Sequence, residues 1–287
     1  MSPSNAAAKL EPPDGGVRAS RRIPLRLIFV FLLVMSAALP AARSQELRVA
    51  AASDLQFAMP DLAAQFEKQS GLQLNVTYGS SGNFSSQIEN GAPFDLFFSA
   101  DVEYPRRLVS SGIAEPDTLF QYALGQIVIW APATSHLNLA QDTWNALLDP
   151  SVQKIAIANP EHAPYGRAAV AALKKANLYD RVQPKFVYGE NISQAAQFVQ
   201  SGNAQAGILA LSLALSPAMR DGKRWQIPAE AHPPIRQAVV VLKASSRQSQ
   251  ARAFLEFLKT SPARATLSSF GFQTPSSAGA PDNSADH

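Results

Sequence analysis

The chain has 287 residues, 46% of them apolar, which is enough to bury a large core and suggests about two domains. It contains no cysteine, which excludes disulfides, thiolate catalysis and cysteine-ligated metal sites. The formal net charge is +3, but residues 1–44 hold six of the 25 basic residues and two of the 22 acidic residues, leaving 19 basic and 20 acidic residues after them. The excess of basic residues therefore lies at the N-terminus, and no basic stripe indicates nucleic-acid binding.

Residues 1–44 are typical of a secretory signal peptide rather than of a folded domain. Four arginines within residues 18–26 precede an apolar run over residues 27–35, and small residues follow over residues 37–42. This is the order of an export signal. The apolar run is shorter than the roughly 20 residues of a membrane span. We therefore expect cleavage near residues 42–44, with an uncleaved anchor as the alternative.

The first predicted unit is a strand followed by a turn and a helix. An apolar run over residues 46–52 predicts the strand, which ends at Ser53 and Asp54. Apolar residues at helical spacing follow, and Gly71 ends the helix. Ser53 or Asp54 therefore begins a helix, where the first amides have no internal partner and the helix dipole favours an anion.

The second unit repeats this arrangement. Alternating apolar residues over 72–78 predict a strand, Ser80 and Ser81 follow in a glycine-flanked turn, and residues 84–91 read as a short helix. Two such turns in neighbouring parallel units would place free amides at one edge of a sheet. A purely structural interpretation, in which one serine is an N-cap in a polar turn, is also open.

A third unit contains a buried strand over residues 94–99 and a helix over residues 102–112. The helix carries Arg106 and Arg107, which a functional interpretation would make anion ligands. Their position in the middle of a helix favours a solvated face instead.

The next strand, over residues 126–132, runs into a proline and a polar loop, which suggests a crossing to a second domain. A short helix over residues 144–150 and a strand over residues 154–158 follow. A further helix begins near Pro164 and Tyr165, which again places free amides after a strand.

The remaining elements complete two similar halves. A strand over residues 184–188 is followed by Asn191, a good N-cap, so that Ile192 offers its amide at a helix start. A buried strand is predicted over residues 206–210. A strand over residues 236–242 returns toward the first domain, and amphipathic helices follow over residues 249–259 and 262–270. Residues 275–287 form a tail without apolar pattern.

Four segments carry a resemblance to a known family: AAAS at 50–53, YGSS at 78–81, GAPFDLFFSAD at 91–101 and NPEHAPYG at 159–166. Through their order and spacing, the chain closely resembles the periplasmic molybdate-binding proteins of ABC transporters, from about residue 47 to residue 272. The resemblance implies an α/β fold with two lobes, each a mixed sheet flanked by helices, joined by crossing strands. Lobe 1 would comprise residues 45–125 and 239–274, and lobe 2 residues 126–238, with 275–287 as a disordered tail.

The resemblance also implies a binding site for a tetrahedral dianion between the lobes. It assigns hydroxyl and amide donors to Ser53 and Ser81, and backbone amides to Tyr165 and Ile192. Asp54 is included in the site, but a carboxylate facing the anion would repel it. We therefore expect Asp54 to turn its side chain outward and offer only its N–H.

One departure from the family concerns the strand predicted over residues 206–210. Many members carry a tyrosine donor in this segment, and the chain has Ala210 there. We expect the phenol of Tyr165 to compensate.

The implied function is capture of molybdate, and of tungstate with it, for delivery to the membrane permease of an ABC transporter. The protein would be periplasmic and monomeric, without enzymatic activity, resident cofactor or direct cation ligands. The oxyanion would be held through the same five residues, and no nucleic acid would be bound.

Three alternatives are open. The same fold could bind sulfate, thiosulfate or another small anion. A secreted hydrolase would use Ser53 or Ser81 as nucleophile with His162, although neither serine lies in a G-x-S-x-G turn. An effector domain of a transcription regulator is disfavoured by the export leader. His162 and Glu161 lack further ligands at metal-binding spacing, which favours a polar loop pair.

Overall fold

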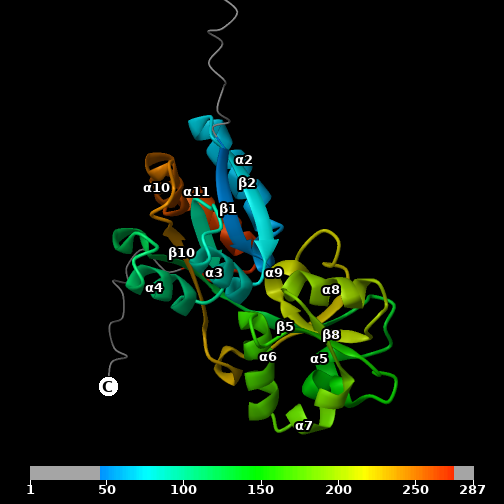
Figure 1. Cartoon of the computed structure of the whole chain (residues 1–287). Helices are drawn as coiled ribbons and strands as arrows, with labels where there is room; N and C mark the ends of the chain where they lie inside the picture. The colour runs from blue at the N-terminus through cyan, green and yellow to red at the C-terminus, as the bar shows by residue number, and fades with distance from the viewer. Residues whose placement is uncertain (1–45, 275–287) are drawn as a thin grey trace, which may run out of the picture. The chain divides into compact units, whose positions relative to one another are not determined.

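The structure is a computed structural model that describes residues 46–274. The signal peptide predicted at residues 1–44 and the tail predicted at residues 275–287 lie outside these described residues. Residues 46–274 form two five-stranded sheets with helices packed against them (Figure 1). This confirms the predicted two-lobe α/β class with a mixed sheet in each lobe.

The first sheet has the strand order β2-β1-β3-β10-β4. Its strands are β1 (Glu46–Ala52), β2 (Gln73–Gly79), β3 (Leu96–Ser99), β4 (Phe120–Gly125) and β10 (Ile235–Val241). The first three are parallel to one another, and β10 is antiparallel to both β3 and β4. We predicted no strand at β4, so the sequence interpretation missed one edge of this sheet.

The second sheet has the order β7-β6-β8-β5-β9. Its strands are β5 (Ile127–Ala131), β6 (Ile155–Ala158), β7 (Phe186–Gly189), β8 (Ala206–Ala210) and β9 (Lys223–Gln226). Strands β6, β7 and β8 are parallel, and β5 pairs antiparallel with β8 and β9. The edge strand β9 was also absent from the prediction.

Helices pack on both faces of the first sheet, because its buried strands alternate side chains between two cores. Leu47, Val49 and Ala51 of β1 face one apolar cluster, and Ala50 faces another. The first cluster includes residues of α2 (Ala58–Ser70), α10 (Gln248–Leu258) and α11 (Ser261–Ser269); the second includes residues of α3 (Ser81–Glu89) and α4 (Glu103–Ser110).

The second sheet packs with its helices around a large apolar cluster. These helices are α5 (Leu139–Asp142), α6 (Pro164–Lys175), α7 (Tyr179–Val182), α8 (Ile192–Gln200) and α9 (Leu211–Ala214). The segment predicted as a helix over residues 144–150 is the 3-10 helix η4 (Thr143–Leu148).

The chain passes from the first sheet to the second at Gln126, which separates β4 from β5. It returns between β9 and β10. All of β10 belongs to the first sheet, so this strand spans the lobe boundary that we placed at residue 238. The side-chain amide of Gln126 donates to Gly271 O at 2.6 Å, and the backbone carbonyl of Gln126 accepts from Leu211 N at 2.9 Å.

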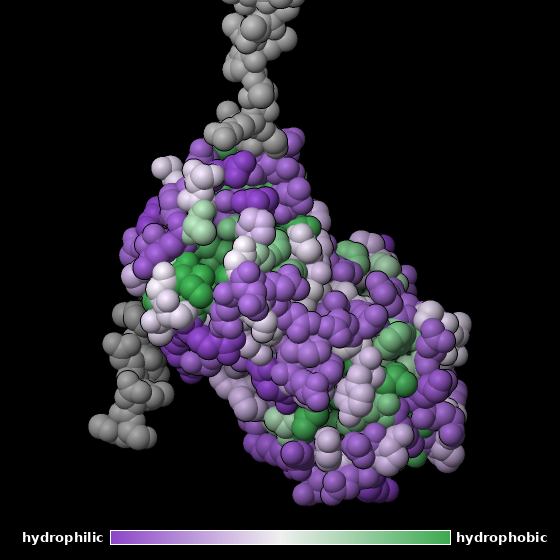
Figure 2. Space-filling model, in the orientation of Figure 1, coloured by the Kyte–Doolittle hydropathy of each residue, from purple (hydrophilic) through white to green (hydrophobic). Residues whose placement is uncertain are grey.

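The surface is mostly polar. Figure 2 shows a face that is largely hydrophilic, with apolar residues in small patches. Among the described residues, Tyr188 is the large hydrophobic side chain that stands exposed, at 46%. No helix among residues 46–274 is long and apolar enough to cross a membrane.

Candidate functional site

A small pocket brings together all five residues that we predicted to hold an anion. It contains about 190 Å³ of empty space, part of it open to solvent. Its lining consists of Ala52, Ser53, Asp54, Gly79, Ser80, Ser81, Ala100, Ala163, Pro164, Tyr165, Asn191 and Ile192. The pocket therefore suits a small ion, and residues of both sheets contribute to it.

The first sheet contributes the turns that follow β1 and β2. These strands pair in parallel, with Ala52 opposite Gly79, so both end at the same edge. The 3-10 helix η2 (Ser53–Leu55) begins directly after β1. Ser80 is the N-cap of α3 and accepts from Asn83 N at 3.4 Å. The capping role considered for one of the two serines thus belongs to Ser80, and Ser81 is left as the first residue of the helix.

The Ser81 side chain is almost fully buried, with 1% of the residue exposed. Its Oγ accepts a hydrogen bond from Ala100 N at 2.9 Å. A hydroxyl that accepts one bond still carries a proton to donate. Ser81 can therefore offer both an amide and a hydroxyl proton to an anion in the pocket.

The second sheet contributes the starts of α6 and α8. Strands β6 and β7 end side by side, with Ala158 opposite Gly189. Helix α6 begins with Pro164 at its first turn, a position where the missing N–H costs nothing. The side chain of Asn191 caps α8 by accepting from Gln194 N at 3.1 Å. Ile192 is thus the first residue of a capped helix, as the sequence predicted.

Helix N-termini supply the positive potential of this pocket. Its lining includes the first residues of α3, α6 and α8, and helices of this length place partial positive charge on their first amides. The lining contains no lysine, arginine or histidine. An anion there would be held by neutral donors and dipoles.

Direct hydrogen bonds join the two sides of the pocket. Ser53 Oγ donates to Asn191 Oδ1 at 3.1 Å, and Ser193 Oγ donates to Ser53 O at 2.8 Å. Gly82 N donates to His162 O at 2.9 Å, and a Cβ on Gly82 would lie 2.7 Å from that oxygen. This turn of the first sheet can approach His162 so closely because it carries a glycine.

Asp54 does not turn outward, which corrects our expectation. The residue is fully buried, and its Oδ2 accepts hydrogen bonds from Tyr165 Oη at 2.9 Å and from Gln237 Nε2 at 2.5 Å. Its Oδ1 has no hydrogen-bond partner among the described residues. Burial is the main cause that raises the pKa of Asp54 to about 6, and the bonds from Gln237 and Tyr165 oppose this rise. The outward orientation was wrong because these two donors hold the side chain inside.

The phenol of Tyr165 is committed within the protein. It donates to Asp54 and accepts from Gln237 Nε2 at 2.9 Å, and burial raises its pKa well above the usual value. Its hydroxyl proton is thus directed at Asp54. We expected this phenol to replace the tyrosine donor that is missing at Ala210; that expectation remains a prediction, and this geometry does not support it. Ala210 ends β8, is buried, and is not among the residues that line the pocket.

Two residues of this network were missed in the sequence. Gln237 lies in β10, and Tyr122 of β4 donates to Gln237 Oε1 at 2.5 Å. Gln237 is a polar residue within an apolar strand, and that interruption was a usable signal. Tyr122 lies in a strand that was not predicted.

The arginines of α4 stand away from the pocket, in agreement with the solvated face that we preferred. Arg106 pairs with Glu103 at 2.7 Å, and Arg107 pairs with Glu89 at 2.7 Å. Neither arginine belongs to the pocket lining.

The hydrolase alternative requires a serine nucleophile in contact with a histidine base, and the described residues do not form this contact. Within residues 46–274 no hydrogen bond joins His162 to Ser53 or Ser81; His162 Nε2 instead lies 3.7 Å from Glu190 Oε2. That distance matches the polar loop interpretation of His162.

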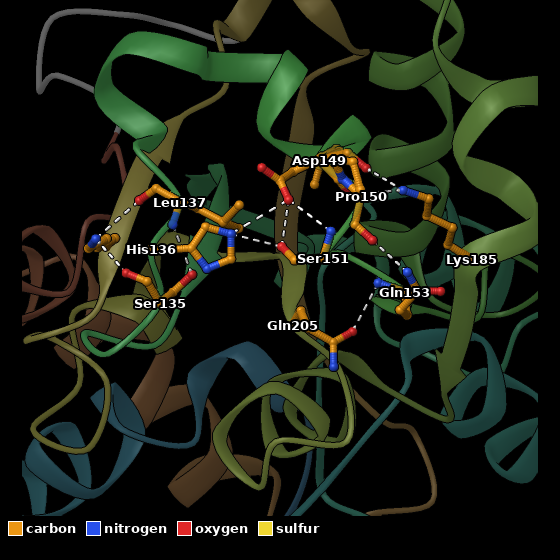
Figure 3. A network of polar contacts seen from close by, with 11 residues as sticks. Ser135, His136, Leu137, Asp149, Pro150, Ser151, Gln153, Lys185 and Gln205 are labelled. Atoms are coloured by element: carbon orange, nitrogen blue, oxygen red, sulfur yellow. Dashed lines mark hydrogen bonds and ion pairs between the residues drawn. The ribbon is translucent and has the colours of Figure 1, made fainter.

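A second histidine near a serine and an aspartate lies at the surface of the second sheet (Figure 3). Ser151 Oγ donates to Asp149 Oδ1 at 2.5 Å and lies 2.9 Å from His136 Nε2. The same ring nitrogen lies 3.5 Å from Asp149, so the carboxylate does not orient the ring through its other nitrogen as a catalytic triad requires. Lys185 and Gln205 bond to the backbone nearby, so the cluster ties loops of the second sheet together.

The described residues hold no group of three or more His, Cys, Asp or Glu side chains that could bind a metal ion. Among residues 46–274, Asp54 is the only carboxylate in the lining of the pocket.

Known proteins match the chain over nearly all of its described length. A family described as "Bacterial extracellular solute-binding protein" matches residues 47–273. The "Molybdate-binding protein ModA" of Rhodobacter capsulatus is 36% identical over 242 residues, which cover 84% of this chain and 93% of that protein. The protein of the same name from Azotobacter vinelandii is 36% identical over 233 residues, covering 81% of this chain and 91% of that protein.

A solved structure agrees with the sequence matches. The periplasmic molybdate-binding protein of Azotobacter vinelandii superimposes with a TM-score of 0.74 at 34% identity, covering 80% of this chain and 99% of that one.

Proposed function

Because the chain belongs to the family of bacterial extracellular solute-binding proteins, we propose that it captures molybdate, and tungstate with it, and delivers the ion to the membrane permease of an ABC transporter. The meeting of Ser53, Ser81, Tyr165 and Ile192 in one small pocket supports this function. Relatives at 36% identity that are named for molybdate binding support the choice of ligand. Asp54 belongs to the same pocket.

Neutral donors suffice to hold such an ion. A dianion loses its hydration shell on burial, and each hydrogen bond to a charged partner returns about 1.5–3 kcal/mol. Six or seven donors would return roughly 10–20 kcal/mol before the costs of ordering and closure. A dissociation constant near 1 μM needs only about −8 kcal/mol. A site without fixed positive charge can thus bind the ion and still release it to a permease.

Selectivity among tetrahedral ions would come from donor spacing. Molybdate and tungstate are larger than sulfate, so rigid donors placed for the larger ions leave sulfate with stretched and weaker hydrogen bonds. The helix starts on the two sides of the pocket supply such rigid donors, since each amide is fixed by its own helix.

Capture would proceed by closure of two lobes close to the predicted ones (residues 45–125 and 239–274 against residues 126–238), with all of β10 in the first lobe. The hinge would lie at the crossing by Gln126 and at the return between β9 and β10. The protein would act as an exported monomer, with residues 1–44 removed.

Calorimetric titration of the purified protein tests this function. We expect molybdate and tungstate to bind at or below about 1 μM and sulfate to bind much more weakly. Ser81→Ala should weaken molybdate binding by about 2–3 kcal/mol, because a donor to the anion is lost. Ser110→Ala, which removes an exposed hydroxyl of α4, is the matched control and should leave the titration unchanged.

Two results would count against the proposal. Equal affinity for sulfate and molybdate would favour a general sulfate site. An unchanged titration for Ser81→Ala would show that the anion does not occupy this pocket.

A further inference from the structure

We propose that Asp54 takes up one proton when the pocket binds a fully ionised tetrahedral oxyanion, so that its carboxyl group donates a hydrogen bond to the anion. This inference rests on the function proposed for the pocket. It assigns to a single side chain a pH dependence of anion capture that the neutral donors by themselves would not produce.

The geometry of Asp54 is the first support. The residue lines the pocket and has no exposed surface. One carboxyl oxygen, Oδ2, is occupied by Tyr165 and Gln237, whereas Oδ1 has no partner among the described residues. A buried polar atom without a partner is costly and calls for an explanation. A hydrogen bond from a protonated Oδ1 to a bound anion would satisfy it.

The side chains that contact Asp54 among the described residues are uncharged. Tyr165 of α6, Gln237 of β10 and Tyr122 of β4 face it from the packed elements, and Ser212 of α9 donates to its carbonyl oxygen at 2.8 Å. The two tyrosines stay neutral, because burial raises their pKa values well above the usual range. Among residues 46–274, no lysine, arginine or histidine forms an ion pair with Asp54.

The protonated form is accessible near neutral pH. Burial raises the pKa of Asp54 to about 6 in the anion-free protein. An anion with two negative charges in the same pocket stabilises the neutral form further, because like charges disfavour ionisation. The proton comes from solvent and converts the carboxylate into a carboxyl group, and no bond within the anion changes.

Proton uptake can be counted directly. Molybdate is titrated into the purified protein by calorimetry, in buffers of different ionisation enthalpy, from about pH 6 to about pH 8.5. We expect close to one proton per anion at the upper end and less at the lower end. The dissociation constant should rise by up to about tenfold per pH unit above pH 7, because the competent protonated form becomes rarer.

Asp54→Asn is the decisive variant. An asparagine keeps an oxygen that accepts from Tyr165 and Gln237, and its amide nitrogen supplies the donor without a titrating proton. We expect binding without proton uptake and with little pH dependence, at least as tight as in the parent protein at high pH. Asp180→Asn, which removes an exposed carboxylate of α7, should keep the parent's proton uptake.

Infrared difference spectroscopy gives an independent measurement on the unaltered protein. Addition of molybdate should produce the carbonyl band of a neutral carboxyl group, and the band should be absent from Asp54→Asn. If Asp54→Asn does not fold, the proton count and the infrared band of the parent protein still decide the matter.

The outcomes separate this inference from the proposed function. Tight molybdate binding with no proton uptake and no pH dependence would overturn the role of Asp54 and leave the function intact. Proton uptake that persists in Asp54→Asn would also overturn it, by placing the proton elsewhere. Absence of molybdate binding at every pH would overturn the function and this inference together.

Discussion

Replacing Asp54 with asparagine should stabilise the anion-free protein at neutral pH. The residue is fully buried, and burial raises its pKa from the ordinary value of 3.8 to about 6. The folded state therefore holds this proton more tightly than the unfolded state does. The corresponding contribution to stability is fully present below about pH 4 and is lost as the pH rises through about 6.

The size of the effect follows from the shift in pKa. One pKa unit corresponds to 1.36 kcal/mol, so a shift of about two units gives about 3 kcal/mol. Above about pH 6 the folded parent protein carries this cost of a buried, unpaired carboxylate. The asparagine variant does not, since it keeps the acceptor for Tyr165 and Gln237 without the charge.

Urea unfolding without anion, at several pH values from about 4 to about 7.5, measures this effect. The free energy of unfolding of Asp54→Asn, minus that of the parent, should rise by about 3 kcal/mol across this range. The difference removes the contributions of all other titrating groups, which the two proteins share. Asp180→Asn should show no such rise. Parallel curves for Asp54→Asn and the parent would refute the reasoning.

Three further substitutions probe the site and the core. Tyr165→Phe removes a hydrogen bond that lowers the pKa of Asp54, so the stability loss with rising pH should continue to a pH above about 6; a loss that ends at the same pH as in the parent would contradict this in urea unfolding. Gly82→Ala places a Cβ 2.7 Å from His162 O, so molybdate affinity should fall about tenfold or more while the circular dichroism spectrum stays unchanged. Full affinity in calorimetry would show that the close contact between residue 82 and His162 is dispensable. Phe254 lies in a buried cluster of aromatic rings, so Phe254→Ala should lower the free energy of unfolding by about 3–5 kcal/mol. A decrease of less than about 1 kcal/mol in urea unfolding would contradict the core role of Phe254.

The strands that the sequence predicted correctly are those whose apolar residues form a run or alternate along the chain; β2 alternates in this way although its residues are exposed or half-buried. Each residue of β3, β6 and β8 is buried, and these segments read as short apolar runs. The missed strands have weaker patterns: β9 is the polar segment Lys223–Gln226 at a sheet edge, and β4 alternates only in part. A strand without a strong apolar pattern depends on backbone pairing with a neighbour, which leaves little trace in local sequence.

The turns that line the pocket were also largely determined by local sequence. A strand followed by a small or capping residue and an amphipathic helix predicted the helix starts at Ser81 and Ile192, and both lie in the pocket. The geometry of a helix start depends on residues within one turn, and such residues are neighbours in the chain. The sequence alone could therefore indicate where free amides would gather.

The orientation of Asp54 was decided only by the tertiary structure. Its partners Tyr165 and Gln237 lie 111 and 183 positions away along the chain, on helix α6 and on strand β10. Considered alone, an aspartate beside an anion site is expected to face water, because ionised carboxylates avoid burial. Packing of distant elements supplied two donors, which hold the carboxylate inside, and removed the solvent, which raises its pKa.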